Sequence, residues 1–140
     1  MKKLFSTAPF QFERGIAVMR IITGLLMLYH GKDIFDSKLM HEYATWDTVK
    51  TFPAPLFMAY LAKGLEFVNG LLLAVGLLTR LNALSMAAVM LIICFKIGNG
   101  KFYYEDQHPF LFAMIAIMFI FTGPGSWSID EAIEKRLNKN

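Results

Sequence analysis

The chain of 140 residues is long enough for one domain, and it is unusually apolar: 56% of its residues are hydrophobic and only 18% are charged, against about a quarter in soluble domains. A net charge of +3 and the lack of a lysine- and arginine-rich run argue against nucleic-acid binding. A single cysteine, Cys94, excludes an internal disulfide and a CxxC redox pair. We therefore expect one membrane domain, 1–140, whose main partner is the lipid bilayer.

Four apolar segments follow one another along the chain, at residues 15–30, 55–78, 81–98 and 108–122. A membrane-spanning helix needs about 20 mostly apolar residues, so the first and the fourth are short unless flanking residues extend them. The soluble alternative, a four-helix bundle in water, requires a polar face on each helix, whereas the third and fourth segments are apolar all round. The sequence therefore predicts an all-α polytopic membrane protein, a bundle of four transmembrane helices.

The loop between the first two segments, residues 32–52, has a pattern of its own. Apolar and aromatic side chains recur there at spacings of three and four residues, namely Phe35, Leu39, Tyr43, Trp46 and Val49. This spacing is typical of one face of a helix, and Trp and Tyr favour the headgroup region of a bilayer. We expect a short amphipathic helix on the outer surface, either a packed cap over the bundle or a gate.

The C-terminal residues 128–138 match a helix that begins with a capping box. Ser128 and Glu131 have the S-x-x-E spacing, which satisfies free backbone amides at a helix start. Ile129, Ile133 and Leu137 then form an apolar stripe. The pattern predicts a short amphipathic helix on the cytoplasmic side.

Lysine and arginine counts in the loops predict the orientation, because these residues are enriched on the cytoplasmic side. Seven lie in the two termini and the second loop: Lys2, Lys3, Arg14, Arg80, Lys135, Arg136 and Lys139. Four lie on the other side: Lys32, Lys38, Lys50 and Lys101. We expect a multi-pass protein of the cell membrane with both termini in the cytoplasm.

Charged residues inside the predicted spans mark the candidate site, because they cost several kcal/mol in lipid and usually face partners in the bundle interior. They are Arg20, Lys63, Glu66 and Lys96. Counted from the outer ends of their spans, Arg20 and Glu66 both lie about 15 Å deep, which predicts a buried Arg20–Glu66 ion pair. Counted from the inner ends the two depths disagree, so the first helix must begin before Arg14 or tilt.

Three cations against one carboxylate leave a surplus of two positive charges. A neutral lysine, help from the outer carboxylates Glu105 and Asp106, or a bound anion or polar ligand would each resolve this surplus. We therefore weigh two interpretations, a purely structural ion pair without a ligand and a polar pocket that opens outward. The residues predicted for this ligand pocket are Lys63, Lys96, His30, Tyr60 and His108.

Metal and catalytic motifs give no further site. His30, His108, Glu105 and Asp106 gather near the predicted outer rim, but their spacing matches no closed ligand set. No nucleotide-binding, zinc-protease or nucleophile-elbow motif is present. We expect no metal, no evident cofactor and no enzyme activity of the chain on its own.

Three stretches resemble the DoxX family of small four-span bacterial membrane proteins: "MRIITGLLMLYHGKDIF", "EFVNGLLLAVGLLTRLNAL" and "FTGPGSWSID". The residues that carry the resemblance are Arg20, Gly24, His30, Gly31, Lys32, Glu66, Gly70, Thr79, Arg80, Gly123, Gly125, Ser128 and Asp130. The resemblance implies an inner-membrane protein, a link to quinone-dependent sulfur oxidation and the label of an oxidoreductase, and it makes a quinone the one cofactor to consider.

Three functions remain open at this stage. The first is a non-catalytic membrane subunit or scaffold of a redox- or stress-related complex, which docks a redox-enzyme partner or binds a quinone. The second is a transporter of a small anion or a proton, and the third is a purely structural protein that organises an assembly or lipids. Homo-oligomers are a further prediction, because Gly64, Gly70 and Gly76 permit close helix contacts.

Overall fold

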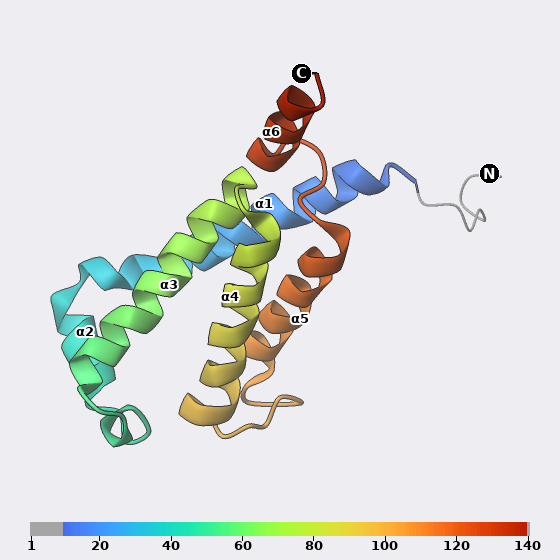
Figure 1. Ribbon diagram of the computed structural model, residues 1–140. Coiled ribbons are helices and arrows are strands. Elements are labelled where there is room, and N and C mark those ends of the chain that lie inside the picture. Colours follow the sequence, from blue (N-terminus) through green and yellow to red (C-terminus); the bar gives the residue numbers. More distant parts are fainter. Residues whose placement is uncertain (1–9, 140) are drawn as a thin grey trace.

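A computed structural model describes residues 10–139, and within this range every regular element is a helix (Figure 1). Lys2 and Lys3, which enter the orientation prediction, lie outside the described residues. The elements are α1 (Phe12–Gly31), η2 (Lys32–Phe35), α2 (Ser37–Ala44), η3 (Val49–Thr51), α3 (Pro55–Val75), α4 (Thr79–Ile92), the π-helical η4 (Ile93–Ile97), α5 (Gln107–Thr122) and α6 (Ile129–Leu137). The predicted all-α class is confirmed.

The four long helices pack in pairs. Helix α1 packs mainly on α3, α4 packs on α5, and a smaller interface joins α3 to α4. Helices α3 and α4 are connected by a tight turn and diverge toward their other ends, where α2, η3 and the 98–106 loop lie (Figure 1).

Two helical segments are long and apolar enough to cross a membrane: α3, with 21 residues, and Thr79–Ile97, with 19. Helix α5 is apolar but has only 16 residues, and α1 carries Arg14 and Arg20. Large apolar side chains cover the outside of all four helices; Leu25 is 56% exposed, for example, and Leu81 65%. Such continuous apolar surface is rare on soluble proteins, so these helices are suited to a lipid environment.

Glycines bring α1 and α3 into backbone contact. A Cβ atom added at Gly24 would lie 2.8 Å from the carbonyl oxygen of Gly70, and one at Gly70 would lie 2.8 Å from the carbonyl oxygen of Gly24. A Cβ atom at Gly31 would lie 2.8 Å from the Cβ of Phe67. Small residues at such positions are how membrane helices approach closely. Three family-motif glycines therefore serve the α1–α3 interface.

The loop between α1 and α3 forms a shorter helix than predicted. Helix α2 ends at Ala44, because the Thr45 hydroxyl donates a hydrogen bond to the carbonyl of Glu42 at 2.7 Å and a turn follows. Trp46 therefore lies beyond the helix, and Val49 is buried at the start of η3. The predicted continuous face from Phe35 to Val49 is wrong in its length, since the chain turns in its middle.

The capping box predicted at the C-terminal helix is confirmed, with one difference. The Ser128 hydroxyl accepts a hydrogen bond from the amide of Glu131 at 3.1 Å. The Glu131 carboxylate accepts from the amide of Trp127 at 3.1 Å, one residue before the expected donor. Ile129, Ile133 and Leu137 form the apolar stripe and are exposed.

Candidate functional site

Arg20 is fully buried, and the acceptors of its hydrogen bonds are backbone carbonyls. Its Nε donates to Pro124 at 2.8 Å, and its Nη1 donates to Leu73 and Ala74, both at 2.7 Å. Its Nη2 donates to Trp127 at 2.9 Å and to Ser126 at 3.4 Å. The predicted Arg20–Glu66 ion pair is therefore wrong.

Arg20 binds these carbonyls because its side chain lies at the C-terminal end of α3. The last carbonyls of a helix have no partner inside it and carry a partial negative charge, and Arg20 reaches those of α3 at Leu73 and Ala74. The depth count assumed that both spans begin at one level on the outer side. Counted instead from Arg14 and from Arg80, Arg20 and Glu66 lie at different depths. The structure agrees with this second count, because Arg20 lies at the C-terminal end of α3 and Glu66 lies in its middle.

The closing signature completes the junction around Arg20. Asp130 caps α4 from a distance: its carboxylate accepts hydrogen bonds from the amides of Leu78 and Thr79, both at 2.8 Å. Gly76 has a φ of +70°, and a Cβ atom there would lie 2.7 Å from Nη1 of Arg20. Gly123 and Gly125 also have positive φ, 77° and 65°, and Ser128 is buried beside them. The signature residues thus hold the turn between α3 and α4.

Thr79 and Arg80, the Thr-Arg pair of the second motif, begin α4 at the same junction. Thr79 is buried and binds Asp130 through its amide, whereas Arg80 is exposed, with its guanidinium near Gly123. Neither residue reaches the charges of α3 at the opposite end. This junction is structural, and the candidate site lies elsewhere.

The polar site is centred on Lys63 and Glu66. The Lys63 ammonium lies 2.8 Å from a carboxylate oxygen of Glu66, with only 18% and 6% of the two side chains exposed. Lys63 also donates to the carbonyl of His30 at 3.3 Å and lies 3.9 Å from the carboxylate of Asp33. The Tyr43 hydroxyl donates to that same carboxylate at 2.9 Å. Four elements therefore contribute to one hydrogen-bonded group.

Tyr43 lies in α2, between α1 and α3, and its environment favours the neutral phenol. Burial, followed by the hydrogen bond and negative charge of Asp33, raises the pKa of Tyr43 to about 12. The Lys63 ammonium lies 5.4 Å from the centre of the Tyr43 ring, which adds a cation–π contact. Tyr43 therefore presents a protonated hydroxyl at neutral pH.

A cavity of about 310 Å³ lies beside this group, in the space between the diverging helices α3 and α4. Tyr43, Lys63 and Glu66 form its polar wall, and the other walls are almost wholly apolar side chains of the outer loop, α3, α4 and η4. Two of these, Leu61 and Ile92, are also 42% and 50% exposed on the flank of the molecule. The predicted polar pocket is therefore an apolar cavity with one polar wall, bordered by the apolar flank.

A second cavity of about 80 Å³ lies on the other side of Glu66. It is lined by Glu66, by the two histidines His30 and His108, and by apolar neighbours that include Phe112. The imidazole rings of His30 and His108 have their centres 4.9 Å apart. Glu66 lines both cavities, as does Ile93.

The remaining residues of the predicted pocket are placed differently. Tyr60 and Lys96 line neither cavity, and Lys96 is exposed on η4. The predicted surplus of buried positive charge also disappears, because Lys96 faces outward and the partly buried Asp33 joins Glu66, so that two carboxylates offset Arg20 and Lys63. This removes the argument for a compensating anion.

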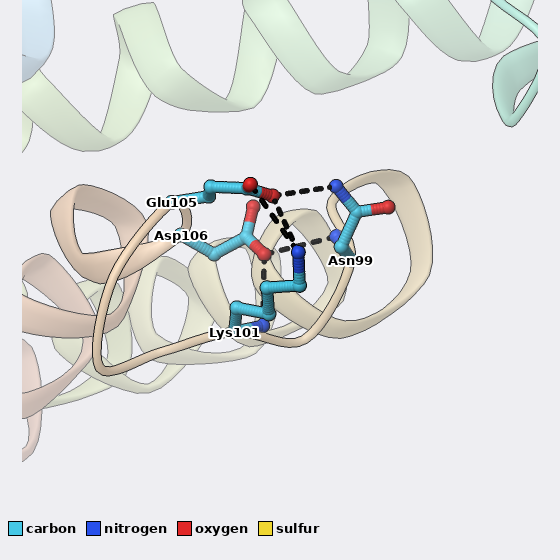
Figure 2. A network of polar contacts seen from close by, with 4 residues as sticks. All are labelled: Asn99, Lys101, Glu105 and Asp106. Atoms are coloured by element: carbon cyan, nitrogen blue, oxygen red, sulfur yellow. Dashed lines mark hydrogen bonds and ion pairs between the residues drawn. The ribbon is translucent and has the colours of Figure 1, made fainter.

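Glu105 and Asp106 hold together the loop between η4 and α5 (Figure 2). Asp106 accepts hydrogen bonds from the amides of Asn99 at 2.9 Å and Lys101 at 3.0 Å. Glu105 accepts from the side-chain amide of Asn99 at 3.0 Å and pairs with Lys101 at 3.3 Å. Within residues 10–139, no group of three or more His, Cys, Asp or Glu side chains is placed to hold a metal ion.

Sequence reasoning missed Asp33 and gave Tyr43 only a role in surface packing. Asp33 follows the His-Gly-Lys motif directly, just beyond the first apolar segment. That first segment contains no acidic residue that could pair with Lys63, so the position of Asp33 was a usable signal. Tyr43 reaches the site only because the chain folds back after α2, which local spacing does not indicate.

The DoxX family model matches residues 15–99, more than half of the chain. The chain belongs to the DoxX family. The matched range of this DoxX protein contains Arg20 and the Lys63–Glu66 pair, while the closing signature at 123–130 lies beyond it. DoxX proteins are membrane proteins, so the apolar outer surface of the helices faces a lipid bilayer.

Two bacterial relatives cover most of this DoxX chain. It is 29% identical over 126 residues to "Putative oxidoreductase CatD" of Bacillus subtilis (strain 168), and the aligned region covers 89% of this chain and 90% of that relative. It is 28% identical over 128 residues to "Inner membrane protein YqjF" of Escherichia coli (strain K12), covering 87% and 94%. No solved structure is significantly similar to it.

Proposed function

We propose that this DoxX protein is a four-span subunit of the bacterial inner membrane that binds a quinone for a redox-enzyme partner. The observation that carries the proposal is the apolar cavity of about 310 Å³ with the Lys63–Glu66 pair and Tyr43 in its wall. A quinone combines an apolar ring and tail with two carbonyl oxygens that accept hydrogen bonds, and this cavity is complementary to both parts.

The cavity has a suitable size and suitable donors. Its volume falls at the lower end of the roughly 300–1,000 Å³ typical of small-molecule sites. An ammonium has three N–H donors, and Lys63 uses two of them on Glu66 and the His30 carbonyl. The third is available to Asp33, 3.9 Å away, or to a carbonyl of the ligand. A bound quinone would supply two-electron redox chemistry, and the side chains would bind its oxygens and exclude water.

The membrane arrangement supports entry from the lipid. With α1 and α5 added to the two longer apolar segments, the chain crosses the membrane four times; α1, with 20 residues, is about 30 Å long. Both termini then lie in the cytoplasm, and the cavity lies in the outer half of the bilayer. Exposed Leu61 and Ile92 border the cavity on the lipid side, so a lipid-soluble molecule has a direct approach.

The names of the two relatives are consistent with a redox-related role in the inner membrane. One is called an oxidoreductase and the other an inner membrane protein. We infer for the present chain a non-catalytic role, in which the electrons come from a separate redox enzyme. Homo-oligomers remain a prediction.

The test is to isolate the protein in lipid nanodiscs taken directly from bacterial membranes and to measure the quinone extracted per protein. The double variant Lys63→Met/Glu66→Gln removes two of the three polar groups of the wall, and it removes both charges of the Lys63–Glu66 pair together. Loss of a charge-assisted hydrogen bond, about 1.5–3 kcal/mol, predicts roughly ten- to hundredfold weaker binding. Lys96→Met, an exposed lysine outside both cavities, is the matched control and should retain the quinone.

The alternative functions give other results in the same experiment. If the wild-type protein retains no more quinone than empty nanodiscs, the ligand-binding function is wrong. A purely structural or lipid-organising protein would then be favoured, and the phenotype of each variant would follow its stability alone.

A further inference from the structure

The small cavity joins the molecular surface to the buried carboxylate through groups of decreasing exposure. His108, in the first turn of α5, is exposed; His30, near the end of α1, is half-buried; Glu66, in the middle of α3, is 5% exposed. All three line the same cavity of about 80 Å³. Three helices therefore place three proton-binding side chains, of decreasing exposure, around one small cavity.

The cavity has the size and chemistry to hold water between these groups. A water molecule occupies about 30 Å³ of the liquid and needs two to four polar partners, so there is room for about two molecules. Two imidazoles and a carboxylate supply those partners, because an imidazole can donate from one nitrogen and accept at the other. The ring centres of His30 and His108 are only 4.9 Å apart, within reach of a direct or water-mediated proton transfer.

We propose that His108, His30 and Glu66 form a water-filled proton relay between the outer surface and the wall of the large cavity. The relay would serve protonation of a ligand in that cavity, so its purpose rests on the proposed function, whereas its existence does not. Glu66 is the inner end because it lines both cavities and holds the Lys63 ammonium on its far side.

The charged groups around the relay define its limits. His108, Glu66, Lys63 and Asp33 act electrostatically on His30. Asp33 is bound to Lys63 and Tyr43 on the side of the large cavity, and the pKa of Tyr43 is raised to about 12 by burial and by Asp33. Tyr43 therefore keeps its proton and is not a member of the relay.

The experiment is a light-triggered pH jump on the protein in nanodiscs without quinone, followed by infrared absorption. A caged proton is released, and the rise of the carboxylic-acid band of Glu66 is recorded. Glu66→Gln identifies this band, because the band is absent in that variant. We expect His108→Ala to slow the rise at least about tenfold, and added imidazole in the buffer to restore it. His41→Ala, which removes an exposed histidine that contacts the carbonyl of Ser37, should leave the rate unchanged.

Three results would overturn the relay: no Glu66 band between pH 4 and 9, an equal rate in wild type and His108→Ala, or a slow rate that imidazole does not restore. His108→Asn repeats the test with a polar side chain that does not titrate, in case the alanine variant is unstable. Because no quinone is present, failure of the relay and failure of quinone binding are separate outcomes.

Discussion

Replacing Gly70 with alanine adds one methyl group where α1 and α3 touch. The new Cβ atom would lie 2.8 Å from the carbonyl oxygen of Gly24 and also against the amide nitrogen of Leu28. Both are backbone atoms, so no side-chain rotation relieves the contact, and the helices must separate by more than about half an ångström. A gap of about 0.5–1 Å forfeits a quarter to a half of the dispersion attraction between facing atoms.

The magnitude follows from two opposing effects. Overpacking of this kind costs about 1–3 kcal/mol, while replacing glycine by alanine inside a helix gains about 1 kcal/mol. We expect the Gly70→Ala variant to be less stable than the wild type, with a lower Tm for thermal unfolding in detergent micelles.

Gly64→Ala on the same helix is the matched control. A Cβ atom at Gly64 would meet only the Cδ1 atom of Ile34, at 3.3 Å, and this flexible side-chain end can move. The control should keep the wild-type Tm or raise it. If both variants unfold at the same temperature, backbone contact between α1 and α3 is not what these glycines provide.

Three further predictions concern the inner junction and the outer loop. Arg20→Gln should lower the unfolding free energy by at least about 3 kcal/mol, because several charge-assisted hydrogen bonds of about 1.5–3 kcal/mol are lost; an unchanged denaturation midpoint would contradict this role. Asp130→Ala should lower the Tm because α4 loses its cap, whereas Asp47→Ala, at an exposed surface pair, should not; equal effects would refute the cap. Tyr43 should ionise near pH 12 in an ultraviolet titration, and Asp33→Asn should lower that value. Since the folded pKa is raised from 10.0, the associated stability is present below pH 10 and is lost as the pH rises through about 12.

The helices were predictable because their signals are local. Four apolar segments mark α1, α3, α4 and α5, and the Ser128 capping box begins α6. The second segment was predicted to run to residue 78, whereas α3 ends at Val75, before Gly76 in the left-handed conformation. Each of these features is determined by residues within one or two helical turns, so a single sequence is sufficient to find it.

The partners of the buried charges were not predictable in the same way. Arg20 binds backbone carbonyls, and every residue type, proline included, offers the same backbone acceptor, so no sequence pattern points to Leu73 or Pro124. Lys63 and Glu66 share a helix face, and their pairing was available from spacing alone. A depth count along unplaced helices outweighed that simpler indication and assigned Glu66 to the wrong partner.

The most direct test of quinone binding in the α3–α4 cavity is photolabelling with an azidoquinone, followed by mass spectrometry of the labelled peptides. We expect labels on the cavity-lining residues within 43–52 and 58–66, and we expect an excess of unmodified quinone to prevent them. The Lys63→Met/Glu66→Gln variant should label weakly, and Lys96→Met should label like the wild type. Labels spread along the lipid-facing helices, with no competition by unmodified quinone, would contradict a quinone site in this cavity.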